Sequence, residues 1–190
     1  MTTKRLFVLA LEGTRTEPQY FEVVVSKSPH SAIKIVGGNR SDPKSLLKSM
    51  KRYLSNSPIG EFDEAWIVID RDNWTDAQIS EIFRWTLSDS AYGLALSNPK
   101  FEFWLLLHFC DAVDCKTSQE CDTQIRRYIP NYDKSIQRNL ISLEGIKLAV
   151  SRAKTKDYPP CNDWPREPGN STVYRLVEKI ISDPAIPERM

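Results

Sequence analysis

The chain has 190 residues, enough for one domain with a substantial buried core. Its hydrophobic content of 41% and charged content of 27% are those of an ordinary globular protein, which argues against a disordered or fibrous chain. The apolar run at residues 6–11 is too short for a signal peptide core or a membrane span. We therefore expect a cytoplasmic protein that does not contact a membrane.

The net charge of +1 hides an uneven distribution along the chain. Residues 60–114 contain eleven Asp or Glu and three Lys or Arg, whereas residues 116–157 contain nine Lys or Arg and five Asp or Glu. An acidic middle followed by a basic segment is typical of a metal centre beside a surface that binds a polyanion. Solvated helix faces would give the same distribution, so both interpretations stay open.

Short apolar runs alternate with helical patterns in the first half of the chain. The runs at residues 5–11, 31–37, 65–69 and 92–96 have the composition of buried strands, and helices are predicted near residues 16–25, 42–54 and 75–86. Such alternation, with right-handed crossovers, specifies a mostly parallel sheet flanked by helices. We predict a Rossmann-like α/β fold in which residues 1–97 form the alternating core.

The second half of the chain has helical patterns. Residues 100–109 are almost wholly apolar and predict a central helix, and further helices are predicted at residues 118–129, 142–156 and after residue 170. Residues 157–169 contain four prolines and predict a long loop. Residues 98–190 are therefore expected to be a helical extension of the same single domain, which spans residues 1–190.

Carboxylates follow two of the predicted strands at the point where each strand ends. Glu12 follows the first strand, and Asp70 and Asp72 follow the central one. Ligands bind outside the carboxyl ends of strands in open α/β sheets, and carboxylates gathered there need a cation. If the two strands are neighbours, these three residues could bind Mg²⁺ or Mn²⁺. Alternatively, Asp70 and Asp72 only begin a loop and cap the next helix.

Two further polar residues lie on the apolar helix near residues 100–109. Glu102, in its first turn, is either a fourth carboxylate of the site or an exposed residue that suits the helix dipole. His108 is either a hydrogen-bonded core histidine or a catalyst. The sequence leaves both choices open.

The chain has four cysteines, Cys110, Cys115, Cys121 and Cys161. They lack CxxC spacing, and together with His108 they match no standard zinc site. We therefore expect reduced, structural cysteines, as in other cytoplasmic proteins.

Three blocks of sequence occur in a fixed order. They are Leu11-Glu12-Gly13-x-x-Thr16-Glu17-Pro18-x-Tyr20-Phe21, then Asp63-x-x-Trp66-x-x-x-Asp70-x-Asp72, then Ser97-Asn98-Pro99-x-Phe101-Glu102-x-Trp104-Leu105-Leu106-x-His108-Phe109. Together with Asn170-Ser171-Thr172-Val173-Tyr174 they resemble the RloB family over most of the chain. RloB proteins are similar to the Toprim group of topoisomerases, primases and OLD-type nucleases. Their location in bacterial restriction-associated and anti-phage loci implies a defence role.

The resemblance implies that Asp70 and Asp72 hold Mg²⁺, with Glu12 as a ligand or general acid/base in phosphodiester chemistry. The chain lacks a GxxxxGK[ST] phosphate-binding loop and an evident topoisomerase tyrosine, which leaves nuclease as the activity within this class. We predict a metal-dependent nuclease of RNA or DNA, with Glu12, Asp70, Asp72 and Glu102 as its catalytic carboxylates. The residues expected to contact nucleic acid are Arg71, Lys100, His108, Lys147, Arg152 and Lys154.

Two other functions stay open at this stage. The chain could be a non-catalytic Toprim-like module that binds a nucleotide, nucleic acid or partner protein, or it could be an assembly subunit. The partner could be another defence protein, such as an ATPase or restriction component. A second copy of this chain is also a candidate, because Trp74, Trp85 and Trp164 are expected to be exposed.

Overall fold

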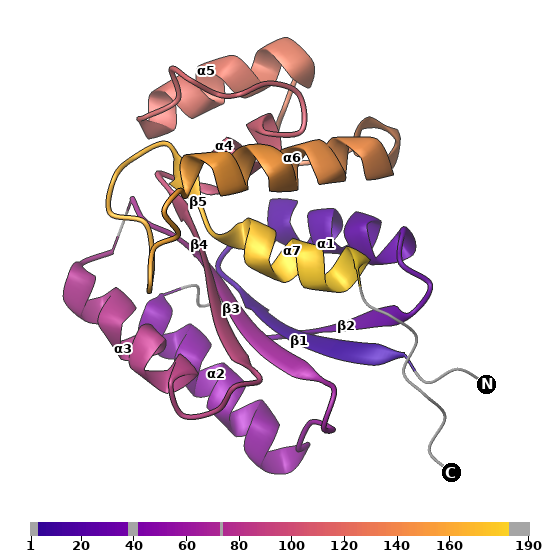
Figure 1. Cartoon of the computed structure of the whole chain (residues 1–190), viewed down its shortest axis with the longest axis vertical. Coiled ribbons are helices and arrows are strands. Elements are labelled where there is room, and N and C mark those ends of the chain that lie inside the picture. The colour runs from indigo at the N-terminus through magenta and orange to yellow at the C-terminus, as the bar shows by residue number, and fades with distance from the viewer. Residues whose placement is uncertain (1–3, 38–41, 73, 183–190) are drawn as a thin grey trace.

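The computed structural model describes residues 4–37, 42–72 and 74–182, and its centre is a five-stranded sheet (Figure 1). The strands are β1 (Arg5–Leu11), β2 (Ser31–Val36), β3 (Glu64–Asp70), β4 (Tyr92–Asn98) and β5 (Asn170–Ser171). Their order is β2-β1-β3-β4-β5, and only the short β5 is antiparallel to its neighbour. The predicted mostly parallel α/β fold is confirmed.

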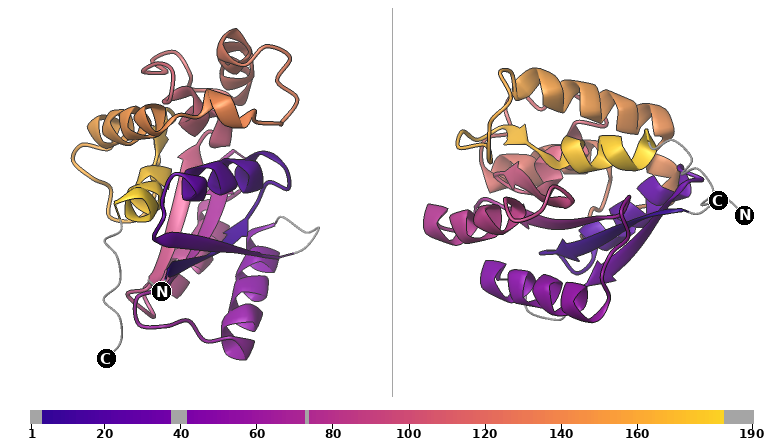
Figure 2. Two further views of the ribbon diagram at one scale, coloured as in Figure 1. Left: turned by 90° about the vertical axis from the view of Figure 1, so that its right-hand side faces the viewer. Right: turned by 60° about the horizontal axis from the view of Figure 1, so that its bottom comes forward.

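Helices cover both faces of this sheet, and Figure 2 shows the sheet between the two layers. One layer contains α1 (Thr16–Ser26), α4 (Phe101–Leu106), α6 (Leu143–Lys156) and α7 (Val173–Ile181). The other contains α2 (Pro43–Asn56) and α3 (Asp76–Thr86). A last helix, α5 (Ser118–Tyr128), packs beside α4, and a 3₁₀ turn covers Arg138–Leu140. Among the described residues, no helix is long and apolar enough to cross a membrane.

The strands are apolar on both faces because both faces are covered. In β1, Phe7 and Leu9 point into the core beneath α1, whereas Val8 and Ala10 point into the core beneath α2. A strand buried in this way reads as a continuous apolar run rather than an alternating one. Two of the tryptophans that were expected to be exposed are buried. Trp85 and Trp164 are 7% and 3% exposed, so they are not available for an interface with another protein.

A crevice is expected between β1 and β3 from the connections alone. The chain leaves β1 through α1 on one face of the sheet and reaches β3 through α2 on the other face. Where connections diverge in this way, the carboxyl ends of the two strands border an open crevice. Leu11 is paired with Val68, so Glu12 and Asp70 reach the same edge of the sheet.

The structure corrects the prediction of four reduced cysteines. Cys115 and Cys121 form a disulfide with Cα atoms 5.2 Å apart, and Cys110 and Cys161 are free. Thr117 begins α5 with a capping box, and the resulting turn brings the loop residue Cys115 beside Cys121 in the helix. The sequence separation of six matches no standard motif, which is why the pairing was missed.

Candidate metal and nucleic-acid site

A pocket of about 300 Å³ lies at the carboxyl ends of β1 and β3. Four acidic residues line it, each at the start or end of a different element: Glu12 after β1, Glu17 in α1, Asp70 at the end of β3 and Glu102 in α4. Two basic residues, Arg15 and Lys134, line the same pocket. We refer to this cavity as the acidic pocket.

Glu12 is held in place by the end of β3. Its Oε2 accepts a hydrogen bond from the Asp70 amide at 2.8 Å, and its Oε1 accepts one from Trp74 Nε1 at 3.0 Å. The pKa of Glu12 is raised to about 7, chiefly by burial and also by the charges of Glu17 and Asp72, while the two hydrogen bonds act to lower it. Near neutral pH this carboxyl group can therefore both accept and release a proton, as a general acid/base must.

Asp70 is the least compensated carboxylate of the acidic pocket. Burial raises its pKa well above the ordinary value, and so do the charges of Glu17, Glu12, Glu102 and Asp72. In the described parts of the chain, no group donates a hydrogen bond to its carboxyl oxygens. A cation bound beside Asp70 would therefore relieve an unfavourable charge.

Glu17 was not among the predicted site residues, although it belongs to the first block of the family resemblance. It is 6% exposed, and its Oε1 accepts a hydrogen bond from the Gly13 amide at 2.9 Å. A Cβ atom on residue 13 would lie 1.7 Å from Glu17 Oε2, so a larger residue there would displace this carboxylate. Burial raises the pKa of Glu17.

Glu102 is 2% exposed, which corrects the interpretation that it is an exposed residue at a helix end. Its Oε1 accepts hydrogen bonds from Tyr132 Oη at 2.9 Å and from Lys134 Nζ. Lys100 Nζ lies 4.0 Å from its other oxygen. Tyr132 and Lys134 come from the loop after α5, and no periodic pattern in the sequence pointed to them.

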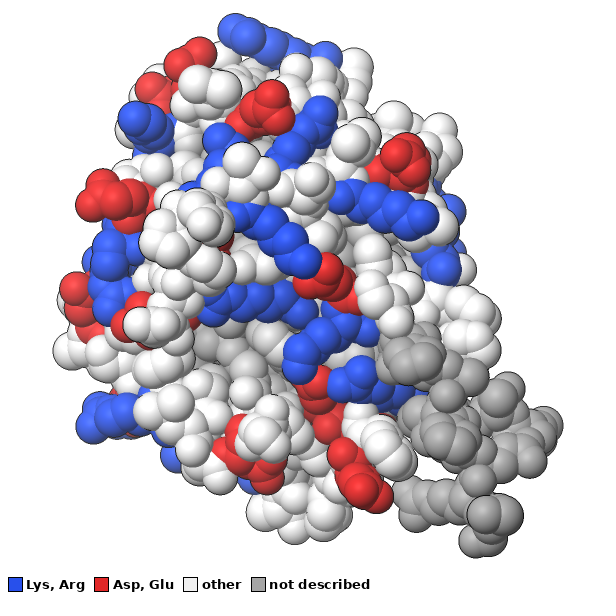
Figure 3. All heavy atoms as spheres, viewed as in Figure 1, with Lys and Arg blue, Asp and Glu red and all other residues white. Residues whose placement is uncertain are grey.

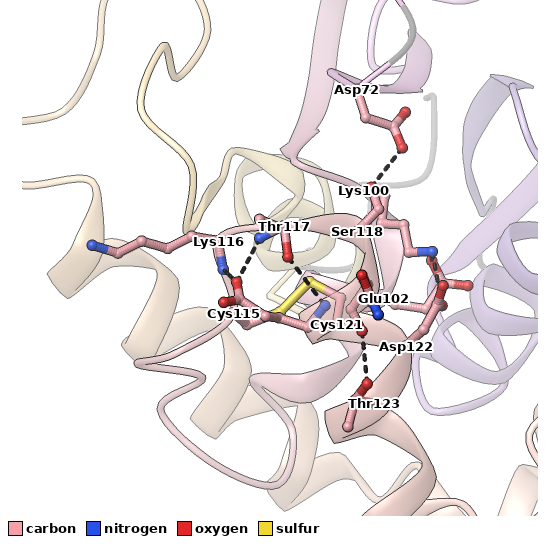
Figure 4. Close-up of a disulfide and its surroundings, with 12 residues drawn as sticks. Asp72, Lys100, Glu102, Cys115, Lys116, Thr117, Ser118, Cys121, Asp122 and Thr123 are labelled. Atoms are coloured by element: carbon pink, nitrogen blue, oxygen red, sulfur yellow. Dashed lines mark hydrogen bonds and ion pairs between the residues drawn. A yellow bond between two sulfur atoms is a disulfide. The ribbon is translucent and has the colours of Figure 1, made fainter.

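Asp72 lies at the rim of the acidic pocket rather than among its lining residues. The amides of Arg71 and Asp72 both donate to the Pro99 carbonyl at 3.1 Å, which fixes the loop after β3 against the loop after β4. The Asp72 side chain is exposed, and its Oδ2 accepts a hydrogen bond from Ser118 Oγ at 2.8 Å (Figure 4). The structure thus brings Glu12 and Asp70 together and places Asp72 beside α5.

The predicted basic contacts are dispersed. Lys100 is beside the site, 8% exposed, and donates to Asp122 at 2.7 Å, whereas Arg71 pairs with Asp76 of α3 at 2.8 Å. The α6 residues are Lys147, which is exposed, Arg152, which pairs with Asp111, and Lys154, which pairs with Glu178. Figure 3 shows that basic and acidic side chains are interspersed on the face of the molecule that is seen in Figure 1. It is not a uniformly basic surface.

His108 does not line the acidic pocket and is 5% exposed. Its Nε2 lies 3.1 Å from Tyr20 Oη, and its Nδ1 lies 3.1 Å from the Leu105 carbonyl. Burial lowers its pKa to about 4, so the ring is neutral at pH 7. We therefore correct the expectation that His108 contacts nucleic acid, since it is a hydrogen-bonded core residue.

The carboxylates of this site have the chemistry that Mg²⁺ or Mn²⁺ requires. Among the described residues, no three His, Cys, Asp or Glu side chains are already gathered as a metal-binding group. The donors near the acidic pocket are nevertheless carboxylate oxygens, which these ions prefer, and no described residue donates a hydrogen bond to the Asp70 carboxyl group. Glu12 and Asp70 could hold such an ion, with Asp72 reaching it from the rim.

The raised pKa of Glu12 gives a testable dependence of stability on pH. Between pH 4.5 and about 7 the unfolded chain loses this proton while the folded protein keeps it, so stability falls as pH rises. Relative to Glu12→Gln, we expect the free energy of unfolding of the metal-free wild type to fall by up to about 3 kcal/mol over this range. Urea denaturation at each pH measures the free energy of unfolding. Glu61→Gln, at an exposed position, should follow the wild type, and parallel curves for all three proteins would contradict the assignment.

Comparison with known proteins adds one finding. A family model described as RloB-like protein matches residues 7–180. Searches of curated proteins and of solved structures found no match. The matched range contains all four acidic residues of the pocket and Lys134. The chain therefore belongs to the RloB-like protein family.

Proposed function

We propose that this protein is a metal-dependent nuclease that acts in the cytoplasm as part of a bacterial anti-phage defence system. The observation that carries the proposal is the Asp70 carboxylate, which is surrounded by other carboxylates and receives no hydrogen bond within the described residues. Such an arrangement is unfavourable by itself and becomes favourable with a bound divalent cation. The resemblance to Toprim nucleases points to the same chemistry.

The residues of the acidic pocket suit hydrolysis of a phosphodiester bond. Bound Mg²⁺ or Mn²⁺ would stabilise charge on the phosphate group and lower the pKa of a water molecule. Glu12, whose pKa is about 7, is suited to take the proton from that water. Lys134 lines the pocket beside Glu102, so its ammonium group would contact a phosphate oxygen there, and Lys100 lies 4.0 Å from Glu102.

The substrate we propose is nucleic acid, either RNA or DNA. Arg15 and Lys134 are about half exposed and line the pocket, so they can meet the phosphate backbone of a substrate that reaches Asp70. Lys147, which is exposed on α6, is a further proposed contact to the backbone of the nucleic acid. A second defence protein, such as an ATPase or restriction component, would supply the activating signal.

One observation favours the alternative of a non-catalytic binding module. Lys134 already pairs with Glu102, so part of the negative charge is neutralised without a metal ion. A module of this kind would bind nucleic acid or a partner protein with no need for a divalent cation. It would also retain its affinity when Asp72 is replaced.

A cleavage assay separates these functions. Labelled tRNA, single-stranded RNA and both forms of DNA are incubated with wild type and Asp72→Asn in Mn²⁺, Mg²⁺ or EDTA. We expect cutting by the wild type that EDTA abolishes and that Asp72→Asn lowers at least about 100-fold, since a metal ligand is lost. Asp76→Asn, which removes a nearby exposed carboxylate, serves as the matched control. Cleavage that resists EDTA, or metal-independent binding without cleavage, would contradict the nuclease proposal.

A further inference from the structure

The disulfide holds α5, which faces the rim of the acidic pocket (Figure 4). Cys121 and Ile125 are the buried residues of this eleven-residue helix, so one of its two buried side chains takes part in the disulfide. Cys115 lies in the loop before the helix and is fully buried together with Cys121. The bond between them joins this loop to the first turns of α5, so it restricts the segment between the two cysteines, which contains Ser118.

Two residues in these first turns contact charged groups of the site. Ser118 Oγ donates to Asp72 Oδ2 at 2.8 Å, and Asp122 Oδ1 accepts from Lys100 Nζ at 2.7 Å. Ser118 is three residues from Cys121 along the helix, and Asp122 is the residue after it. Any movement of α5 that follows opening of the disulfide would therefore change both contacts.

The contact with Ser118 leaves one oxygen of Asp72 available. A carboxylate that binds a metal through one oxygen is commonly oriented by a hydrogen bond to the other, and loss of that bond lowers metal affinity by about 10–100-fold. Ser118 is placed to give Asp72 this orientation. Lys100, held by Asp122, is likewise kept from moving closer to Glu102, its second acidic neighbour.

We propose that the Cys115–Cys121 disulfide makes metal binding at the acidic pocket sensitive to redox state, with Ser118 as the positioning residue that transmits the effect to Asp72. The oxidised protein is the form that binds the metal tightly. This inference rests on the proposed metal-dependent function and adds its regulation.

The chemical step is a thiol–disulfide exchange with a dithiol reductant, such as dithiothreitol or a thioredoxin-class protein. The S–S bond breaks, and Cys115 and Cys121 each gain one electron and one proton. The dithiol loses two electrons and two protons and becomes a disulfide. The flanking Lys116 and Thr117 are exposed, so a local opening of this loop is enough to admit the reductant.

The test measures Mn²⁺ affinity by calorimetry for the oxidised protein and for the reduced protein. Reduction uses dithiothreitol, which is removed by desalting before the titration. The protein is the full chain with Cys110→Ser and Cys161→Ser, which leaves only the disulfide pair to react. We expect the Mn²⁺ dissociation constant to rise about 10-fold on reduction, and Ser118→Ala to raise it similarly without reductant. Hydrogen exchange in α5 should become faster on reduction even without metal. Circular dichroism checks that the reduced protein stays folded.

Controls separate this inference from the function on which it rests. Cys115→Ser/Cys121→Ser should show the weaker affinity whether or not dithiothreitol has been used. Equal Mn²⁺ affinity of the oxidised and reduced forms, with Asp72→Asn still abolishing binding, would overturn the redox inference and keep the metal site. If neither form binds Mn²⁺, the proposed function itself is overturned, and the redox inference with it.

Discussion

Replacing Asp70 with Asn is expected to abolish Mn²⁺-dependent cleavage while making the metal-free protein more stable. The carboxylate is partly buried at the end of β3, near Glu12, Glu17 and Glu102, and receives no hydrogen bond from any described residue. Asn has nearly the same shape, carries no charge and can donate its amide hydrogens to those carboxylates. We expect a gain of about 1–3 kcal/mol in the free energy of unfolding at pH 7, the usual cost of an unsatisfied buried group. Cleavage should fall about 10³-fold, since metal stabilisation of charge is worth several kcal/mol.

The direction of the stability change follows from the raised pKa of Asp70. A group that holds its proton more tightly when folded stabilises the protein at low pH and loses that contribution as pH rises through the folded pKa. The gain from Asp70→Asn should therefore shrink in acid, where the wild-type carboxyl group is protonated. Urea denaturation in EDTA at pH 7 and at pH 4 measures the gain in the free energy of unfolding and its decrease in acid. Asp76→Asn is the control, and a destabilised Asp70→Asn protein or undiminished cleavage would contradict the assignment.

Trp104→Ala is expected to cause the largest loss of stability in the chain, about 3–5 kcal/mol. Trp104 is fully buried in α4 and meets the rings of Tyr20 and His108 edge-on, with centroids 6.2 Å and 5.4 Å apart. Its removal leaves a cavity between α1 and α4 that neighbouring side chains cannot fill without moving. Urea denaturation in the absence of metal measures the change in the free energy of unfolding.

A surface substitution gives the reference for Trp104→Ala. Leu87 is 70% exposed, so Leu87→Ala should change the free energy of unfolding by less than about 0.5 kcal/mol. A change below about 1 kcal/mol for Trp104→Ala would show that α4 is not the central element of its layer. Because α4 also carries Glu102, the variant should bind Mn²⁺ more weakly even under conditions where it remains folded.

The strands could be predicted because a strand that is buried on both faces consists of consecutive apolar residues. The runs Arg5–Leu11 and Glu64–Asp70 are continuous apolar segments, and the helical patterns between them identify the parallel crossovers. From that topology alone, Glu12 and Asp70 were expected at one edge of the sheet, and the Asp70 amide in fact donates to Glu12. Local patterns and one rule of sheet connection were enough for this part of the site.

The remaining contacts depend on positions far apart in the chain. Lys134 reaches Glu102 from a loop without periodicity, and Ser118 reaches Asp72 over 46 residues. Such pairings depend on how α5 packs against α4, which no local pattern encodes. The same limit explains His108, whose burial depends on Tyr20 in a different helix. Long-range packing, rather than residue type, decides which polar groups meet.

The position of β5 and α7 at the end of the chain has a consequence for folding during synthesis. β5 pairs with β4 across more than seventy residues, and α7 packs against α1 and β4. On the ribosome, β1 to β4 can therefore pair before the segment that covers α1 has been made. Until residue 182 has emerged, the parts of α1 and β4 that pack against α7 remain open to water. The nascent chain must then be protected from association with its neighbours for the time that the segment between β4 and the end of α7 takes to be translated.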